Sequence, residues 1–253
     1  MCTLSFVPKV DGFLIAMNRD EQRSRPKALP PALHRHGNMS ALHPSEPTGG
    51  TWIGINEAGL CIALINWYSR PQYIGKAAFS RGEIIPRLLA CTSRNEAETI
   101  LRSFPLDRLN PFRLFVIGEE SLGLREYRSD GNALDGIDHP WTAGHWFSSG
   151  HDESSATEVR GTVCRQAAEK PDQGTLPWLV QLHSSHDPAK EAESVCMHRE
   201  DAVTVSLTTM DVSRHSVTVD YRDGSPCRFP GKSVHSMTLP DTFRIPSDSK
   251  SQS

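Results

Sequence analysis

Residues 2–21 read CTLSFVPKVDGFLIAMNRDE, and two apolar, β-prone runs within them, 3–8 and 13–18, flank the pair Asp11-Gly12. An Asp-Gly pair between two such runs is a strong signal for a β-hairpin. The two strands are therefore expected to be antiparallel neighbours, so that the end of the second returns beside the start of the first. This geometry predicts that the segment from Asn18 to Asp20 lies next to Cys2.

The rest of the chain alternates strand pairs with helix pairs. Strands are expected at 51–56, 60–68, 112–118, 123–128, 194–198, 202–210 and 215–222, and helices from Ser80, after Ser93, and at 155–169 and 175–183. Ser80 with Glu83 and Ser93 with Glu96 fit capping boxes. Strands that pair locally predict antiparallel sheets, and helices arriving in pairs predict a layered α+β architecture.

Two segments are expected to lie outside this regular structure. Residues 22–50 are rich in Pro, His, Gly and Ser, which is typical of a long surface loop. Residues 232–253 are rich in Ser, Pro and Asp and are expected to form a loose tail. Residues 1–231 are then a single domain, in agreement with the length of the chain.

Composition excludes several classes of function. The chain has 27 basic and 30 acidic residues, a formal net charge of −3 and no basic block, so nucleic-acid binding is not expected. No apolar run approaches the roughly 20 residues that span a bilayer. Residues 1–6 lack the features of a secretory signal, and none of the six cysteines forms a C-x-x-C pair. Reduced thiols and a cytoplasmic location are therefore expected.

Cys2 is distinguished from the other cysteines by its position. Methionine aminopeptidases remove an initiator Met that precedes a small residue, which would leave Cys2 with a free α-amino group. Such an amine has an ordinary pKa of about 7.7–8.0, so it can accept the thiol proton and later protonate a leaving amine. The alternative is that Cys2 is an ordinary strand residue.

The string Asn18-Arg19-Asp20-Glu21 resembles the signature of the NRDE family, also called the transport and Golgi organisation protein 2 family. Further strings agree with that family in order along the chain: 1–3, 25–26, 49–54, 80–82 and 194–201. Members of the family have been linked to haem handling and to lipid metabolism. The resemblance therefore keeps open a non-catalytic binding or trafficking protein for haem or an acyl lipid.

A wider resemblance is to the cysteine N-terminal-nucleophile hydrolases, the group that includes penicillin V acylase and bile-salt hydrolase. There, Cys follows Met, an Asn-x-Asp pair closes the first hairpin, and a G-x-N-E-x-G-L string leads into a strand with a polar residue. Asn18 and Asp20 match the pair, and residues 54–60 (GINEAGL) lead to Asn66. The resemblance implies a four-layer αββα fold with two stacked, mostly antiparallel sheets.

The same resemblance implies roles for individual residues. Cys2, Asp20 and Asn66 are expected to be catalytic, with Asp20 holding the α-ammonium of Cys2 and Asn66 donating to an oxyanion. Arg19 is expected to lower the pKa of the thiol or to bind an acidic substrate. Because consecutive strand residues point to opposite faces, Arg19 and Asp20 cannot both face the thiol within a regular strand, and Asp20 is favoured.

Two positions depart from the pattern of the hydrolases. Met17 stands where they have an Arg before the Asn-x-Asp pair. The chain also has Ser149 where they place a mid-chain Asn of the oxyanion hole. We expect Asn18, Arg19 and Ser149 to contact substrate.

A metal or haem site is the competing interpretation of the 11 histidines. No pair of them has a common zinc-ligand spacing, and the haem-attachment string C-x-x-C-H is absent. The sequence therefore predicts no metal and no cofactor. It favours an N-terminal-cysteine amidohydrolase that acts on a small amide or related acyl substrate after removal of Met1, with the binding protein as the alternative; the oligomeric state is left open.

Overall fold

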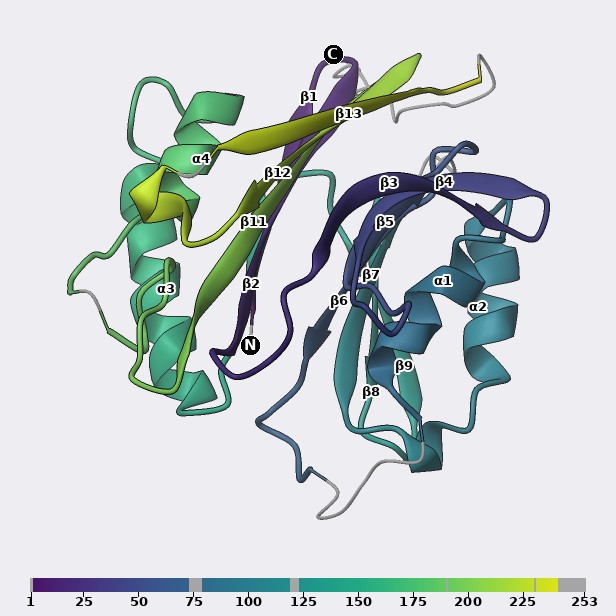
Figure 1. The fold of residues 1–253 in the computed structure, drawn as a ribbon, viewed down its shortest axis with the longest axis horizontal. Coiled ribbons are helices and arrows are strands. Elements are labelled where there is room, and N and C mark those ends of the chain that lie inside the picture. The colour runs from purple at the N-terminus through teal and green to yellow at the C-terminus, as the bar shows by residue number, and fades with distance from the viewer. Residues whose placement is uncertain (1, 73–78, 119–122, 190, 230, 241–253) are drawn as a thin grey trace, which may run out of the picture.

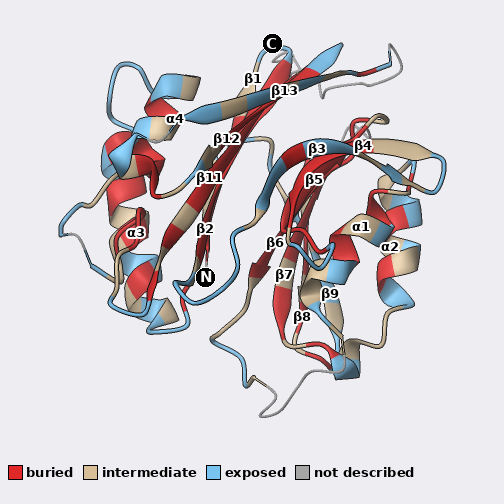
Figure 2. Cartoon of the chain, in the orientation of Figure 1, coloured by how far each residue is buried: buried red, intermediate tan, exposed pale blue. Residues whose placement is uncertain are grey.

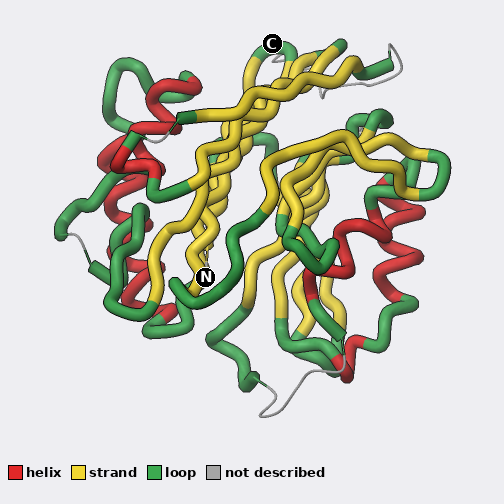
Figure 3. The backbone as a smooth tube through the Cα atoms, viewed as in Figure 1, coloured by secondary structure: helices red, strands yellow, loops and turns green. Residues whose placement is uncertain are grey.

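Two β-sheets packed face to face form the centre of the computed structural model, which describes all residues except 1, 73–78, 119–122, 190, 230 and 241–253 (Figures 1 and 3). The first sheet has the strand order β10-β1-β2-β11-β12-β13 and the second the order β3-β4-β5-β6-β7-β8-β9. All pairings between neighbouring strands are antiparallel. The strands of the first sheet are β1 (Cys2–Lys9), β2 (Gly12–Gln22), β10 (Gly144–Ser148), β11 (Ala202–Ser213), β12 (Ser216–Asp223) and β13 (Lys232–Thr238). Those of the second are β3 (Leu29–His36), β4 (Met39–Ser45), β5 (Ile53–Asn56), β6 (Cys61–Asn66), β7 (Phe112–Ile117), β8 (Leu124–Ser129) and β9 (Leu134–His139).

Helices cover the outer face of each sheet. Helices α3 (Glu153–Ala167) and α4 (Leu176–His183) lie on the first sheet, and α1 (Ile84–Leu88) and α2 (Arg94–Arg102) lie on the second (Figure 1). The expected capping boxes are partly realised: Ser80 caps a 3₁₀ turn, Arg81–Glu83, that leads into α1, and the Ser93 side chain caps α2. The expected four-layer αββα arrangement is confirmed.

The side chains of β2 point alternately into two apolar layers, one on each face of the first sheet. Phe13, Ile15 and Met17 pack into the core between the sheets, whereas Leu14 and Ala16 pack against the layer of α3 and α4. Successive side chains of a strand point to opposite faces, so a strand buried on both faces must be apolar almost throughout. The strands at the centre of the first sheet are buried (Figure 2), and the first half of β2 follows this rule, whereas β11 also buries Thr204, Ser206, Thr208 and Thr209.

The hairpin expected around Asp11-Gly12 is present, with Cys2 paired to Arg19 at its open end. Gly12 also permits a close approach to β11. A Cβ at this position would lie 1.9 Å from the carbonyl oxygen of Val212. The position therefore requires glycine for packing against β11.

The expectation of a loop over residues 22–50 is wrong for most of that segment. Strands β3 and β4 form a hairpin there. β3 is an edge strand, and its pairing is irregular between Leu29 and Ala32, where Pro30 and Pro31 lie. Proline cannot donate to a β-ladder, but it is tolerated at an edge, which is why these prolines misled the sequence analysis.

Three further expectations need correction. Residues 232–238 form edge strand β13 instead of a tail, and residues 241–253 of the expected tail lie outside the described residues. Residues 194–198 are not a strand but an irregular segment with one isolated bridge, from His198 to Val203. Strands β9 and β10 were not expected, because their sequences lack the apolar alternation of the other strands. Among the described helices, none is long and apolar enough to cross a membrane.

Ile15 provides a test of the core between the sheets. Its side chain is fully buried at the centre of β2, so we expect Ile15→Ala to lower the free energy of unfolding by about 2–5 kcal/mol, through lost burial and the cavity left behind. The control is Val10→Ala, because Val10 lies in the same hairpin and is 99% exposed. Urea denaturation measures both; equal losses in the two variants would contradict this account of the core.

Candidate active site

Cys2 begins β1 at a point where neighbouring strands flank it on both sides. Its Cα partners are Arg19 on β2 and Ser148 on β10. Residues directly opposite each other in antiparallel strands share a face, so all three side chains belong to the face between the sheets. Cys2 is 7% exposed and belongs to the core cluster there.

A cavity of about 130 Å³ opens beside Cys2, and its lining includes Arg19, Asp20 and Asn66. The structure thus brings together four of the six residues that the sequence singled out, from β1, β2 and the end of β6. The other two, Asn18 and Ser149, are not part of this lining.

Asn18 points to the opposite face of the sheet. Its side-chain amide donates to the carbonyl oxygens of His183 (2.8 Å) and Val195 (2.9 Å), and the residue is fully buried. The structure therefore places the Asn18 side chain away from the cavity beside Cys2. Asn18 instead fixes the end of α4 and the segment before β11 to β2, because a buried amide requires such partners.

Arg19 faces the thiol, contrary to the preference for Asp20 alone. Its guanidinium donates to Glu46 (2.6 Å) and Glu21 (3.2 Å) and lies 4.6 Å from the centroid of the Trp52 ring. Arg25 contacts the same two carboxylates, at 2.9 and 3.2 Å. Two cations and two anions therefore form one network at the mouth of the cavity, which holds Arg19 in place.

Asp20 reaches the site by another route. Its carboxylate accepts a hydrogen bond from the Thr204 hydroxyl (2.6 Å) and lies 3.5 Å from the guanidinium of Arg160, on the helix side of the sheet. Its main-chain amide hydrogen-bonds the Cys2 sulfur. Asp20 thus borders the cavity, whereas its carboxylate lies on the helix side of the sheet. Arg19 and Asp20 can therefore both line the cavity although their side chains point to opposite faces of β2.

Arg160, on α3, is the main residue that the sequence analysis missed. It is fully buried, and its guanidinium contacts Asp20, the hydroxyl of Thr3 (3.0 Å) and the carbonyl oxygen of Cys2 (3.4 Å). It also donates to the carbonyl oxygens of Ala192 and Glu193. In the sequence, Arg160 is one polar residue in an amphipathic helix, and nothing in its spacing relates it to residues 2–20.

Two loops close the cavity on the side of the second sheet. Gly50, Thr51 and Trp52 in one loop meet Arg81 and Gly82 in the other: the amide of Thr51 donates to Gly82 (3.1 Å), and a Cβ on Gly50 would lie 3.3 Å from Gly82. Thr51, Trp52, Arg81 and Gly82 all line the cavity. These loops are the strings 49–54 and 80–82 of the family resemblance, which the structure thus places in contact.

The candidate oxyanion donors come from separate elements near Cys2. Asn66 lines the cavity and donates to the Tyr68 hydroxyl at 2.7 Å. Ser149 lies one residue beyond the position paired with Cys2, and its hydroxyl accepts from the amide of His151 (3.3 Å). Ser148 is the residue opposite Cys2, and its buried hydroxyl has no hydrogen-bond partner within the described part of the chain. Ser148, and not Ser149, is therefore the serine that lies opposite Cys2 in the sheet.

Burial governs the ionisation of the thiol. It raises the pKa of Cys2, and the negative charge of Asp20 adds to this rise, while the charge of the terminal amine, the amide of Asp20 and Arg19 oppose it. A thiolate is therefore disfavoured in the chain as described. A positive charge placed on Cys2 itself would favour it.

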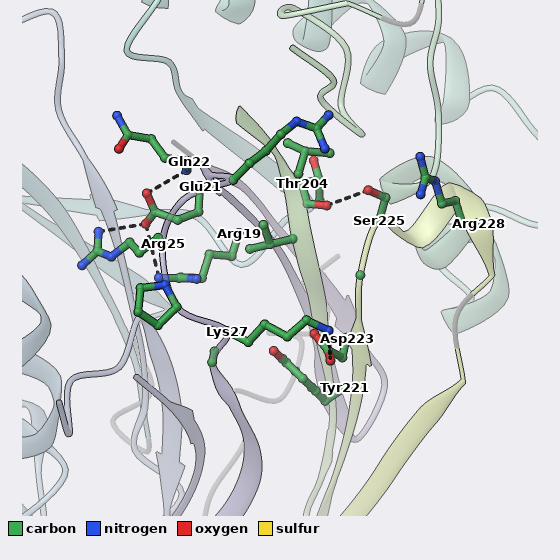
Figure 4. Close-up of a pocket in the computed structure, with 16 residues that line it drawn as sticks. Arg19, Glu21, Gln22, Arg25, Lys27, Thr204, Tyr221, Asp223, Ser225 and Arg228 are labelled. Carbon is green, nitrogen blue, oxygen red and sulfur yellow. Dashed lines mark hydrogen bonds and ion pairs between the residues drawn. The ribbon is translucent and has the colours of Figure 1, made fainter. Parts of the chain in front are cut away.

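A second, larger cavity of about 400 Å³ adjoins the first and shares Arg19, Glu21 and Arg25 with it (Figure 4). Five of its lining residues are cationic and two are acidic, which gives a formal charge of +3. The cationic residues are Arg19, Arg23, Arg25, Lys27 and Arg228, and the acidic ones are Glu21 and Asp223. An anionic group would be attracted to this cavity.

A cluster of potential metal ligands lies near Thr204 of β11, a residue that also lines the larger cavity. His186, Cys196, His198 and Cys227 place their ligand atoms within 4.8 Å of one another. The sequence analysis predicted no metal because the spacings between these residues match no common motif. Three separate segments contribute, so only the fold brings them together.

Comparison with solved structures defines the class of the fold. The chain is similar to penicillin V acylase from Agrobacterium tumefaciens, with a TM-score of 0.56 and 12% identity over 96% of this chain and 88% of that one. It is also similar to a cysteine-to-alanine variant of conjugated bile acid hydrolase from Clostridium perfringens, with a TM-score of 0.51 and 13% identity over 97% and 99% of the two chains. The fold is that of the N-terminal-nucleophile hydrolases.

The family follows from the sequence itself. Residues 1–155 match the model of the family described as Transport and Golgi organisation 2. This is more than half of the chain, and the chain therefore belongs to that family. A search of curated proteins finds no significant match.

The pair of Asp20 and Arg160 yields a double-mutant test. Arg160→Met leaves the Asp20 carboxylate buried without its cation, so we expect it to lower the free energy of unfolding by about 3–5 kcal/mol. Asp20→Asn introduced into that variant should recover part of the loss, because the uncompensated charge is gone. Urea denaturation of the wild type, both single variants and the double variant gives the coupling energy. Additive effects would contradict a direct interaction between the two charges.

Proposed function

We propose that the protein is an N-terminal-cysteine amidohydrolase that cleaves a small amide or related acyl substrate after Met1 has been removed. The observation that carries the proposal is the position of Cys2: the first strand residue borders a cavity together with Arg19, Asp20 and Asn66. A nucleophile needs a base within hydrogen-bond reach, and the α-amine of a processed Cys2 lies on the same residue.

In the proposed first step, the α-amine takes the proton of the thiol, and the sulfur attacks the carbonyl carbon of the amide. A carbon–sulfur bond forms, and the carbonyl electrons move onto the oxygen. When this intermediate collapses, the carbon–nitrogen bond breaks and the α-ammonium protonates the departing amine. The acyl group remains on Cys2 as a thioester.

In the second step, water replaces the amine. The α-amine accepts a proton from water, the oxygen attacks the thioester, and the acid leaves as the carbon–sulfur bond breaks. The proton returns to the sulfur, which regenerates the starting thiol. Arg160 acts through position here: its contacts with the Cys2 carbonyl and with Asp20 fix the nucleophile, and fixed geometry supplies much of catalysis.

The side-chain amide of Asn66 and the hydroxyl of Ser148 are the proposed oxyanion donors. Asn66 ends β6 and lines the cavity beside Cys2, Ser148 ends β10 opposite Cys2, and both groups can donate a hydrogen bond. Asp20 already accepts from Thr204, but a carboxylate has further lone pairs that can accept from the α-ammonium of Cys2.

The larger cavity suggests which part of the substrate is charged. Its formal charge of +3 and its shared wall with the smaller cavity favour a substrate that carries an anionic group a short distance from the amide. The residues of that shared wall, Arg19, Glu21 and Arg25, are visible in Figure 4.

The test begins with intact mass, which reports whether Met1 is removed. Hydrolysis is then measured on two chromogenic anilides, glutaryl-p-nitroanilide with a carboxylate and butyryl-p-nitroanilide without one. We expect Met1 to be absent, the glutaryl compound to be cleaved faster, and Cys2→Ala to reduce cleavage to the uncatalysed rate. Retained Met1 on an active protein, or full activity in Cys2→Ala, would contradict the proposal.

Ser148 and Ser149 provide a matched pair for the oxyanion site. Ser148→Ala should lower kcat by about 100-fold, as removal of one oxyanion donor does elsewhere, with KM little changed. Ser149→Ala is the same substitution one residue along, at a position that is not paired with Cys2, and should lower kcat far less. Equal losses in the two variants would remove Ser148 from the site.

The pH dependence of alkylation tests the thiol directly. Iodoacetamide reacts with the thiolate, and burial raises the pKa of Cys2 above its ordinary value of 9.0. In a chain engineered to retain Met1, the rate should still be rising above pH 9, whereas in the processed chain the adjacent α-ammonium should move the rise to lower pH. Cys61, whose pKa burial raises to about 12, is the slow internal reference in peptide mass mapping. Identical profiles for the two chains would contradict the role of the α-amine.

A further inference from the structure

The four residues His186, Cys196, His198 and Cys227 offer a set of nitrogen and sulfur ligands outside the proposed active site. Each supplies one ligand atom, and all four atoms lie within 4.8 Å of one another. Cys196 is buried and the other three are partly buried, so the cluster is largely screened from water. Two thiols and two imidazoles are the ligand set of a structural zinc site.

The distances within the cluster correspond to the edges of a tetrahedron. Bond lengths of about 2.3 Å to sulfur and about 2.0 Å to nitrogen place neighbouring sulfur and nitrogen ligands about 3.5 Å apart around one zinc ion. The Nε2 atom of His198 lies 3.6 Å from the sulfur of Cys196 and 3.4 Å from the sulfur of Cys227. The rings of His186 and His198 are nearly perpendicular, at 70°, with centroids 5.0 Å apart. Both rings can therefore point a nitrogen at one centre without stacking.

Three separate segments of the chain meet at this cluster. His186 follows α4, Cys196 and His198 lie in the irregular segment before β11, and Cys227 lies in the 3₁₀ turn Pro226–Arg228 after β12. A bound ion would link these three segments through its coordination bonds. Such a link would hold the irregular segment 194–198 in place although it forms no regular strand.

Hydrogen bonds connect the cluster to Asp20. The amide of Met197, between two of the ligands, donates to the Thr204 hydroxyl (2.8 Å), which in turn donates to Asp20 (2.6 Å). On the other side, the Ser225 hydroxyl, two residues before Cys227, donates to the carbonyl oxygen of Thr204 (2.8 Å). Two of the three ligand-bearing segments, the one before β11 and the turn after β12, therefore hold Thr204 against Asp20.

We infer that His186, Cys196, His198 and Cys227 bind one Zn²⁺ ion as a structural site that holds the segment before β11 and the turn after β12 against Thr204. Binding displaces one proton from each thiol, so two thiolates and two neutral imidazoles surround the ion. The resulting centre has no open position and takes no part in amide cleavage. The inference does not depend on the proposed function.

The test uses the full chain. Metal content of the purified protein is measured by mass spectrometry, and the metal-free protein is titrated with Zn²⁺ and with Co²⁺. We expect one Zn²⁺ per chain, and a Co²⁺ spectrum with the intense d–d and sulfur-to-cobalt bands of a tetrahedral thiolate site. Zn²⁺ should also raise the Tm, because an ion that binds only the folded state stabilises it.

Substitutions then assign the ligands. Cys227→Ser and His186→Ala should each weaken Zn²⁺ binding by at least about 100-fold, since even outer-shell changes cost 10–100-fold. Cys164→Ser and His151→Ala are the matched controls, because Cys164 lies on α3 and exposed His151 precedes it, both outside the cluster, and both should keep full affinity. His186 and Cys227 are both only partly buried, so both variants should fold, and each tests the site independently of the other.

Three results would overturn the inference. One is a Co²⁺ complex without thiolate bands. Another is unchanged Zn²⁺ affinity in His186→Ala. The third is a Cys196–Cys227 disulfide in the natively purified protein, found by non-reducing peptide mapping, together with no bound zinc.

Discussion

The contact between the buried guanidinium of Arg160 and the carboxylate of Asp20 is the interaction on which the site depends. Both side chains are fully buried, and a charge removed from water must find compensating partners in the protein. Arg160 satisfies this requirement with Asp20, Thr3 and the carbonyl of Cys2, so the first residues of β1 are joined to α3 and to the end of β2. Without the pair, the start of β1 would be held by main-chain pairing and by the packing of Cys2 and Leu4 in the core.

The side chains of Asn18 to Glu21 point alternately to the two faces of the first sheet. Asn18 and Asp20 bind the helix layer and its flanking segments, while Arg19 and Glu21 face the loops of the second sheet, where Glu46 and Arg25 complete their network. These four residues therefore connect the helix layer to the second sheet, and each of their charged side chains contacts a side chain of opposite charge. This arrangement leaves Cys2 at the meeting point of both sheets and one helix.

Local sequence signals predicted the elements whose stabilisation is itself local. The Asp11-Gly12 turn fixed the first hairpin and hence the proximity of Asp20 to Cys2, and the capping residues Ser80 and Ser93 marked their helices correctly. Edge strands β3, β9, β10 and β13 were not foreseen, because an edge strand buries little and its composition resembles that of a loop. Arg160, Ser148 and the cluster around His198 were missed for another reason: their partners lie more than a hundred residues away or in separate segments, so no periodicity relates them. Ser148, and not the expected Ser149, is the residue paired with Cys2, and in a strand one residue reverses the face.

The pairing of Cys2 with Ser148 sets an order of events during synthesis. Strand β10 leaves the ribosome 146 residues after Cys2, since 148 minus 2 is 146. At about 5–20 residues per second, this interval is roughly 7–30 s. Throughout that time the first sheet lacks the strand that encloses the chain's first residues, and these remain accessible to ribosome-associated processing enzymes. Pairing of β10 with β1 then buries Cys2, so the removal of Met1 that the proposed function requires is expected before this pairing forms.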